Sequence, residues 1–461
     1  MEYISLKDIL NAVDGKLIQK GCIEKFNHIT IDTREVKKNS IFVAIKGEKY
    51  NANEFLIQAI KNGAALCIID ELKYNEADLP KDTAVIVVED TRKALLNLAE
   101  FYKSSLNIKV VAITGSTGKT STKDMTYAIL NEKYKVYKTQ GNFNNEIGLP
   151  LTIFKLDKSY DIAILEMGMS HFFEIHNMAK TAKPDIGIIT NIGISHMENL
   201  KNRKNILRAK LEITDYFTSA STLIINTDSD LLESLNIPNR QFELIKCGVN
   251  IKADLRADNI YLGEDFVTFD IGEGEKQVFK NFRVNSPGKH NVFNALLAIE
   301  VGRKFGMTYE EMNRGIEKLQ MTSMRLDILR GSKYTIIDDC YNASPDSMKA
   351  AIDVLHNIKG KRKIAILGSM RELGEEAFNA HKAIGAYAEK NSVDFLIVLG
   401  EFSLAYEEGF SDKCGLKSFN SNENVIKFLK DFLIEGDVIL VKASRAMKFE
   451  EIVNDIKEGN N

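Results

Sequence analysis

The chain has 461 residues, of which 44% are hydrophobic and 27% are charged, and its formal net charge at pH 7 is -3. These values describe a globular protein of roughly two to four domains, and they give no electrostatic reason to expect nucleic acid or an anionic membrane as a partner. The N-terminus carries charges where a signal peptide needs an apolar core, and no segment reaches membrane-spanning length, which predicts a cytoplasmic protein without membrane insertion.

The cysteines are scattered and never occur in C-x-x-C spacing: Cys22, Cys67, Cys247, Cys340 and Cys414. This pattern predicts neither a disulfide framework nor a zinc site. It is typical of incidental thiols in a reducing compartment.

Residues 1–107 contain short alternating segments, which predict a small α/β domain. The expected strands are Ser40–Ile45, Ala64–Ile69 and Ala84–Val88. A helix is expected over Asn53–Asn62.

Residues 108–327 change to a strand-helix pattern, which predicts a P-loop ATPase-type, mostly parallel sheet with helices on both faces. Its expected strands are Val110–Thr114, Asp161–Glu166, Ile186–Thr190 and Thr222–Asn226. Residues 328–461 repeat the pattern as a C-terminal Rossmann-like α/β domain, with strands expected at Tyr334–Asp338, Lys363–Leu367, Phe395–Leu399 and Val438–Lys442. The predicted fold class is therefore α/β in three domains.

Residues 110–122 read VVAITGSTGKTST, an apolar strand followed by a glycine turn and the start of a helix. The turn and the helix N-terminus favour an anion, Lys119 can reach outer phosphates, and the Thr120 hydroxyl can ligate Mg²⁺. The general pattern G-x-x-x-x-G-K-[ST] is incomplete, because Ile113 occupies the position of its first glycine. An ordinary strand-turn-helix corner is the alternative, but the flanking elements favour a site for ATP or GTP.

Further polar residues follow the expected strands. Glu166 ends one strand, where a Walker-B-type carboxylate would hold Mg²⁺ directly or through water; a solvated strand end is the alternative. His196 follows the next strand and is either structural or catalytic. Three amides share one glycine-flanked loop, and they are either turn residues or groups that orient a polar substrate: Asn142, Asn144 and Asn145.

The shortened phosphate loop at Thr114–Thr120 resembles that of the Mur ligases, a family of ATP-dependent amide-forming enzymes. Motifs in all three predicted domains match the family in order: Asp32–Arg34, Phe42–Gly47, Gly141–Gly148, Glu166–Gly168, Asn191–His196, Ala209–Glu212, His290–Asn294, Asp338–Met348, Leu367–Gly374 and Val441–Arg445. The Asp338–Met348 segment and the N-terminal block most resemble the member that adds D-Ala-D-Ala to UDP-N-acetylmuramoyl-tripeptide in peptidoglycan precursor synthesis. A glutamate-adding or folate-extending relative is the nearest alternative.

The resemblance implies an ATP site with Mg²⁺, in which Arg325 faces the γ-phosphate and Asp339 lies near the ribose. The implied ATP-binding residues are Gly115, Ser116, Thr117, Gly118, Lys119, Thr120, Ser121, Asn291, Asn294, Arg325 and Asp339. Asn291 and Asn294 would share one helix face, although such amides can also cap or bridge helices. Either Arg325 or Asp339 could instead serve in a domain-interface salt bridge.

The implied catalytic residues are Lys119, His196, Lys210 and Arg325, and the implied metal ligands are Thr120, Glu166, His196 and Lys210. Lys210 matches the family lysine that becomes an N-carbamate with CO₂, and only that anionic form could hold a second Mg²⁺. The alternative is an unmodified Lys210 paired with Glu212 or Glu166.

The resemblance also implies two small-molecule substrates, UDP-N-acetylmuramoyl-tripeptide and D-Ala-D-Ala. Thr33, Arg34, Lys46 and Gly47 would hold the uridine diphosphate, although the following segment, Glu48–Asn53, departs from the family pattern. The remaining implied substrate contacts are Asn142, Asn145, Tyr341 and Asn342. The third residue of the tripeptide, lysine or diaminopimelate, and the oligomeric state stay open, and a monomer is compatible with the sequence.

Two alternatives come from other classes of protein. A P-loop kinase or nucleotide switch would use Lys119 and Thr120 in the same way but leaves the third domain unexplained. A catalytically silent scaffold for UDP-sugars would tolerate replacement of Lys119, Glu166 and Lys210.

Overall fold

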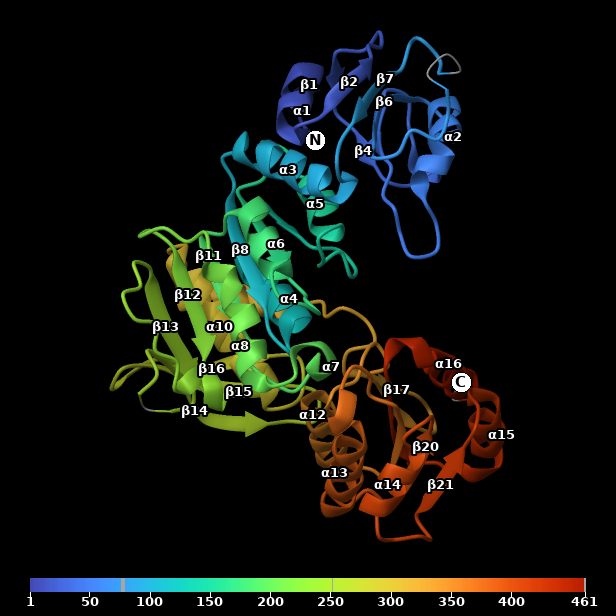
Figure 1. The fold of residues 1–461 in the computed structure, drawn as a ribbon. Coiled ribbons are helices and arrows are strands. Elements are labelled where there is room, and N and C mark those ends of the chain that lie inside the picture. The colour runs from blue at the N-terminus through green and yellow to red at the C-terminus, as the bar shows by residue number, and fades with distance from the viewer. Residues whose placement is uncertain (76–78, 251, 460–461) are drawn as a thin grey trace. The chain divides into compact units, whose positions relative to one another are not determined.

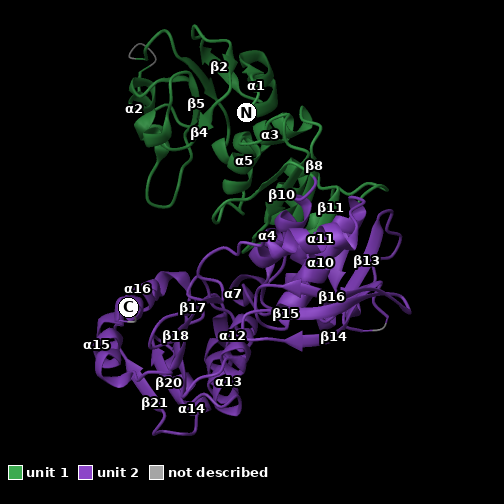
Figure 2. Ribbon diagram, turned by 180° about the vertical axis from the view of Figure 1, so that it is seen from behind, with its two compact units in different colours: residues 1–112, 134–187, 212–221 green, residues 113–133, 188–211, 222–461 purple. Residues whose placement is uncertain are grey.

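The computed structural model describes residues 1–75, 79–250 and 252–459 (Figure 1). The chain divides into two compact units, one of residues 1–112, 134–187 and 212–221 and one of residues 113–133, 188–211 and 222–461 (Figure 2). The division passes through strands β8 (Lys109–Thr114) and β11 (Ile186–Ile189), so each of these strands has residues in both units.

The N-terminal part of the first unit is built on a five-stranded sheet with the order β2-β7-β6-β5-β4. Its strands are β2 (Lys16–Gln19), β4 (Ile29–Thr30), β5 (Ser40–Val43), β6 (Ala64–Ile69) and β7 (Ala84–Val87). All neighbours are parallel except β2 and β7, and β1 (Ile4–Ser5) pairs antiparallel with β3 (Lys25–Phe26) outside this sheet. The three strands predicted here are confirmed.

Helices of this part are α1 (Leu6–Val13), α2 (Leu56–Lys61) and α3 (Thr91–Ser104), with 3₁₀ turns at Thr33–Glu35 and Ala52–Phe55. The helix predicted over Asn53–Asn62 is thus a 3₁₀ turn that continues into α2. Farther along the first unit, β9 (Val136–Lys138) pairs in parallel with β10 (Ile162–Glu166), accompanied by α5 (Gly148–Ile153), α6 (Glu174–Ala182) and a 3₁₀ turn at Glu212–Thr214.

The large sheet has nine strands in the order β16-β15-β14-β13-β12-β11-β8-β10-β9. Strands β12 (Thr222–Asn226), β13 (Glu243–Gly248) and β14 (Leu255–Leu262) are parallel, whereas β15 (Val267–Glu273) and β16 (Lys276–Val284) extend the edge antiparallel. The second unit adds the helices α4 (Lys119–Leu130), α7 (Met197–Leu200), α8 (Arg203–Leu211), α9 (Asp230–Glu233), α10 (His290–Lys304) and α11 (Tyr309–Glu317). The antiparallel edge was not predicted. In β16, exposed Arg283 lies between buried Phe282 and Val284, whereas most of the preceding positions are exposed.

The C-terminal sheet has six strands in the order β17-β18-β22-β19-β20-β21. They are β17 (Asp327–Arg330), β18 (Thr335–Asp338), β19 (Lys363–Gly368), β20 (Phe395–Leu399), β21 (Leu416–Phe419) and β22 (Val438–Lys442), and only β17 is antiparallel to its neighbour. The helices are α12 (Pro345–Asn357), α13 (Ala377–Lys390), α14 (Ser403–Gly409), α15 (Asn422–Phe432) and α16 (Glu450–Gly459), with 3₁₀ turns at Gly374–Glu376 and Arg445–Met447.

This sheet has a hydrophobic core on each face, because successive strand residues point to opposite sides. Ile337 packs with Met348 and other residues of α12 and α13, whereas Ile336 packs with Ile452 and other residues of α15 and α16. The predicted Rossmann-like arrangement, with helices on both faces, is confirmed.

The five cysteines are free thiols, of which Cys67, Cys247 and Cys340 are buried. In the part of the chain that the structure describes, no helix has the length and apolar character needed to cross a membrane.

Candidate active site

The phosphate loop lies where the sequence predicts it, between the end of β8 at Thr114 and the start of α4 at Lys119. Gly118 is the N-cap residue of α4 and has a φ of 78°, a conformation that side chains disfavour. A Cβ atom at Gly118 would lie 2.7 Å from Oδ1 of Asn294, and one at Gly115 would lie 1.8 Å from Oγ1 of Thr190. Both positions therefore require glycine.

The residues that follow β11 hold the loop in place. The backbone N–H of Thr117 donates to Oδ1 of Asn191 at 2.8 Å, and Nδ2 of Asn191 donates to Oγ1 of Thr117 at 2.8 Å. The Ser116 N–H donates to the Asn191 carbonyl at 3.1 Å, and the Gly193 N–H donates to Oγ of Ser116 at 2.9 Å. Asn191 belongs to a motif recognised in the sequence, but the role of its side chain in shaping the loop was not predicted.

Two lysines, Lys119 and Lys210, lie in this part of the site. Nζ of Lys119 donates to the Gly115 carbonyl at 2.7 Å, at the base of the loop. Lys210 is on α8 and only 1% exposed, and its pKa is well below the usual value, first because of burial and then because of the Lys119 ammonium. The neutral amine is thereby favoured, which is the form that reacts with CO₂.

His196 is the N-cap residue of α7, with a φ of 63°, and its Nδ1 lies next to the carboxylate of Glu372. The hydrogen bond from His196 is the main cause of the lowered pKa of Glu372, and the charge of Lys119 adds to it. The Glu372 carbonyl accepts from the Glu198 N–H at 3.2 Å, which fixes the two loops together. Glu372 was part of a recognised motif, but its contact with His196 was not predicted.

Asn291 and Asn294 both lie on α10, as predicted, and are 1% and 5% exposed. Nδ2 of Asn294 donates to Oδ1 of Asn291 at 3.1 Å, and Oδ1 of Asn294 accepts from the Thr122 hydroxyl of α4 at 3.2 Å. Nδ2 of Asn291 donates to Ser286 and to the Pro287 carbonyl. The amide of Asn294 thus bridges α10 and α4, as the alternative to adenine binding predicts. A contact of these amides with adenine stays a prediction.

The turn after β18 carries Asp339, Tyr341 and Asn342, at the carboxyl end of the strand as predicted. Oδ2 of Asp339 accepts from the buried Lys442 ammonium at 2.5 Å, and its Oδ1 accepts from the Leu326 N–H at 3.3 Å. Asn342 is exposed, and its carbonyl accepts from Lys442 at 2.9 Å.

The guanidinium carbon of Arg325 lies 4.3 Å from the centre of the Tyr341 ring. Arg325 also lies within electrostatic reach of Asp339, although the carboxylate of Asp339 bonds to Lys442. The Tyr341 contact and the Lys442 pair were not predicted from the sequence.

In the first unit, Glu166 is 3% exposed and accepts from Nδ2 of Asn144 at 3.0 Å. Oδ1 of Asn145 accepts from the Ile147 and Gly148 N–H groups at 3.2 and 2.8 Å at the start of α5, which is the turn role considered for these amides. Asn142 is exposed in the same loop, where its backbone carbonyl accepts from the Asn144 N–H at 2.7 Å.

Glu212, which the sequence offered as a partner for Lys210, has both carboxylate oxygens at the N-terminus of α6. They accept from the Phe173 N–H, each at 2.9 Å, and one also accepts from the His176 N–H at 3.1 Å. Glu212 therefore caps a helix.

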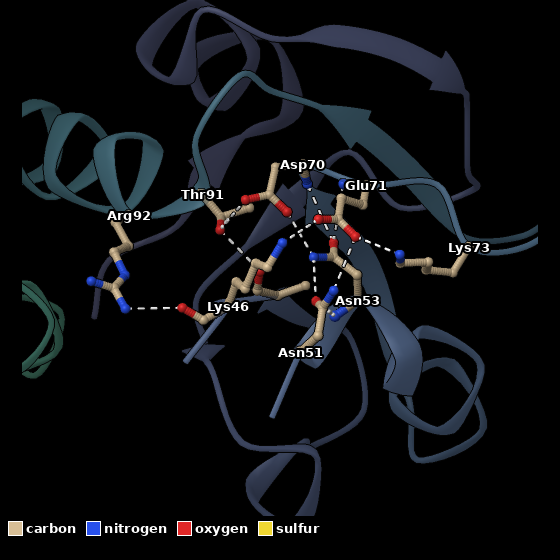
Figure 3. Close-up of polar contacts among 9 residues, drawn as sticks. Lys46, Asn51, Asn53, Asp70, Glu71, Lys73, Thr91 and Arg92 are labelled. Carbon is tan, nitrogen blue, oxygen red and sulfur yellow. Dashed lines mark hydrogen bonds and ion pairs between the residues drawn. The ribbon is translucent and has the colours of Figure 1, made fainter. Parts of the chain in front are cut away.

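The proposed uridine diphosphate residues lie on the first sheet and its loops. Arg34 is exposed, and its Nε donates to Asp32 at 2.9 Å; Thr33 accepts through its carbonyl from Asn62 at 2.8 Å. Figure 3 shows that Lys46 belongs to a polar network, with its Nζ 2.7 Å from Oε1 of Glu71. Gly47 begins the exposed turn after it, where its N–H donates to the Tyr50 carbonyl at 2.9 Å.

Glu71 is the centre of this network (Figure 3). Its Oε2 accepts from Asn51 at 3.0 Å and pairs with Lys73 at 2.6 Å, and together with Lys46 these groups lower its pKa from 4.5 to about 2. Fully buried Asn53 donates to Asn51 at 2.8 Å and to Asp70 at 2.7 Å. The segment that departs from the family pattern thus supports the Lys46 pair. Asp70 and Glu71 directly follow strand β6, and two acidic residues at a strand end are the sequence signal for this network.

The side-chain oxygen atoms of the predicted metal ligands are of a kind that suits Mg²⁺. Within residues 1–75, 79–250 and 252–459, no group of three or more His, Cys, Asp and Glu side chains converges as a metal site. Mg²⁺ commonly keeps several waters and uses one or two protein oxygens together with substrate phosphates. Thr120, in the first turn of α4, and buried Glu166 supply oxygen donors of that kind.

The phosphate loop after β8, its supporting loop and the buried lysine define a P-loop nucleotide-binding protein of the α/β class. The model of the Mur ligase middle domain matches residues 113–302, and that of the Mur ligase, glutamate ligase domain matches residues 324–445. The chain belongs to the Mur ligase family.

Similarity extends over the whole chain. The UDP-N-acetylmuramoyl-tripeptide--D-alanyl-D-alanine ligase of Bacillus subtilis is 37% identical over 98% of this chain and 98% of its own length. Among solved structures, MurF from Acinetobacter baumannii has a TM-score of 0.91 and 28% identity, covering 99% of both chains. MurF ligase from Thermotoga maritima, solved with ADP, has a TM-score of 0.81 and 27% identity, covering 94% of this chain and 97% of that one.

Proposed function

We propose that this protein is an ATP-dependent, ADP-forming amide ligase that adds D-Ala-D-Ala to UDP-N-acetylmuramoyl-tripeptide in peptidoglycan precursor synthesis. The observation that carries the proposal is the full-length similarity to ligases of that name, at 37% identity for the Bacillus subtilis protein. A phosphate loop that is held by Asn191, with Lys119 at its base, agrees with the ATP requirement.

The chemistry begins with a carboxylate, which is a poor acyl electrophile. Transfer of the γ-phosphoryl group of ATP to the terminal carboxylate of the tripeptide gives an acyl phosphate with a good leaving group. The amine of D-Ala-D-Ala attacks that carbonyl, and the tetrahedral intermediate collapses to the amide, releasing inorganic phosphate and a proton. The role of Lys119 is to stabilise negative charge on the transferred phosphoryl oxygens.

Lys210 is proposed to act as a carbamate. Its buried, neutral amine adds to CO₂ to form an N–C bond and releases one proton, and the resulting anion offsets the charge of Lys119. Thr120, Glu166, His196 and the carbamate would hold Mg²⁺, which when bound neutralises charge on phosphate and carboxylate oxygens.

Each domain has one proposed task. Residues 1–107 bind the UDP-muramoyl part through Thr33, Arg34, Lys46 and Gly47, with Asn142 and Asn145 as further contacts. Residues 108–327 bind ATP. Residues 328–461 contribute to the ATP and D-Ala-D-Ala sites, with Asp339, Tyr341 and Asn342 at the end of β18. The proposed location is the cytoplasm, where ATP and the nucleotide precursor are available, and a monomer is compatible with this function.

One assay separates this function from its alternatives. Purified protein is mixed with ATP, Mg²⁺, UDP-N-acetylmuramoyl-tripeptide and D-Ala-D-Ala, and the product mass is measured. A pentapeptide product formed with ADP supports the proposal. Preference for a single amino acid or for a folate would identify another ligase of the family, phosphate on a hydroxyl would identify a kinase, and no ATP-dependent product would identify a scaffold.

A further inference from the structure

The ring of Tyr341 carries the guanidinium group of Arg325. The guanidinium carbon lies 4.3 Å from the ring centre, within the range of a cation–π contact. Because one face of the ring is used in this way, that face is not available to a ligand.

The backbone holds the two residues together as well. The Tyr341 N–H donates to the Met324 carbonyl at 3.3 Å, and the Leu326 N–H donates to Oδ1 of Asp339 at 3.3 Å. Met324 and Leu326, on either side of Arg325, have φ values of 60° and 51°. Non-glycine residues adopt this conformation only where surrounding contacts impose it. The segment before β17 is therefore fixed to the turn after β18.

The guanidinium group is not fully satisfied by the protein. Nε of Arg325 is buried and has no hydrogen-bond acceptor among the residues that the structure describes. A planar guanidinium suits two-point binding of phosphate oxygens, and a buried donor without an acceptor is costly. A phosphate oxygen of the bound nucleotide would supply the missing acceptor.

We infer that Tyr341 is a positioning residue for Arg325, and through Arg325 for the terminal phosphate of ATP, and is not a contact of the dipeptide. The inference rests on the proposed function for the identity of the nucleotide and the dipeptide. It assigns Tyr341 a different role from the substrate contact that the family resemblance implied, because one face of the ring already holds a cation.

The test compares Tyr341→Leu, which removes the aromatic face, with Tyr341→Phe, which keeps the face and removes only the hydroxyl. Calorimetry measures the binding of a non-hydrolysable ATP analogue with Mg²⁺, and steady-state kinetics measures kcat and the KM for D-Ala-D-Ala. We expect Tyr341→Leu to weaken analogue binding by about 3- to 30-fold, the loss of one cation–π contact. The KM for D-Ala-D-Ala should change by less than about twofold, and Tyr341→Phe should restore most of the lost affinity.

A double-mutant cycle tests whether the effect passes through the arginine. In an Arg325→Leu background, Tyr341→Leu should weaken analogue binding no further, because the shared contact is already lost. Equal losses in both backgrounds would overturn the inference. So would a Tyr341→Phe variant with wild-type analogue affinity and a greatly raised KM for D-Ala-D-Ala, since the hydroxyl would then contact the dipeptide.

Analogue binding keeps this test independent of the ligase reaction. If the wild-type protein bound the analogue but formed no amide, the proposed function would fail while the cycle still measured the coupling. If Tyr341→Leu lost its thermal unfolding transition, Tyr341→Phe and Arg325→Leu would still test the inference. Tyr341→Phe must retain the affinity for the ATP analogue that Arg325→Leu loses.

Discussion

The buried ammonium of Lys442, on β22, donates a hydrogen bond of 2.5 Å to the carboxylate of Asp339, in the turn after β18. Lys442 also donates to the Asn342 carbonyl at 2.9 Å. One cation thus connects the residue expected near the ribose with the residue expected at the dipeptide. Some substitutions in this turn should therefore change the free energy of unfolding, and others should change the KM for one substrate.

Asp339→Ala should impair ATP use and also lower the free energy of unfolding by about 3–5 kcal/mol, because it leaves the Lys442 charge buried without a carboxylate. Chemical denaturation and the KM for ATP check both effects. The double variant Asp339→Ala with Lys442→Met removes the unpaired charge and should recover much of the stability without recovering ATP use. If stability and ATP use recovered together, the carboxylate would be only structural.

Asn342→Ala should weaken D-Ala-D-Ala use far more than ATP or UDP-tripeptide use. Asn342 is exposed, and among the described residues its side chain accepts one hydrogen bond, from the Ala343 N–H at 2.9 Å, so little stability depends on it. KM values for the three substrates provide the measurement. Equal, small changes in all three would mean that the segment is a turn without a selective role.

Lys119→Ala should lower kcat by about a hundredfold or more while the thermal unfolding transition remains, because it removes a charge at the transferred phosphoryl group. Its ammonium donates to the Gly115 carbonyl at 2.7 Å, and water can replace that hydrogen bond. Phosphate release measures the rate. Near-wild-type turnover would show that this loop does not serve phosphoryl transfer.

Lys210→Ala should be nearly inactive and should regain part of its activity with acetate, which can supply the missing carboxylate. Lys204→Ala, on the exposed side of the same helix, is the matched control. It should keep wild-type activity, and acetate should not change that activity. Because the pKa of Lys210 is lowered, its amine stays neutral and reactive as the pH falls below the ordinary lysine range. No acetate rescue, together with unmodified Lys210 in the mass spectrum of active enzyme, would argue against the carbamate.

Glu71→Gln should raise the KM for UDP-N-acetylmuramoyl-tripeptide several-fold and leave the KM for ATP unchanged, because the carboxylate that holds Lys46 is lost. The pKa of Glu71 is lowered from 4.5 to about 2, so the stabilisation it gives is complete above pH 4.5 and is lost as the pH falls toward 2. The KM effect should thus be constant between about pH 6 and 9. Lys73→Ala, which removes the other cation at this carboxylate and leaves the Lys46 pair in place, should have a smaller effect. A KM effect confined to ATP would exclude this role.

The sequence alone determined the parts of this protein that depend on local order. The phosphate loop was visible because strand, glycine turn and helix follow one another between Val110 and Ser121. The position of Asp339 to Asn342 followed from the end of a single strand. The predicted strands of the three larger sheets were visible as apolar runs of near-correct length.

The tertiary structure decided which distant side chains meet. Asn191 shapes the loop around Thr117, Glu372 pairs with His196, Glu71 holds Lys46, and Arg325 stacks on Tyr341. None of these pairs is close in sequence, so no spacing rule connects them. The lowered pKa of Lys210 likewise depends on burial and on a neighbour far along the chain, two quantities that exist only once the chain is folded.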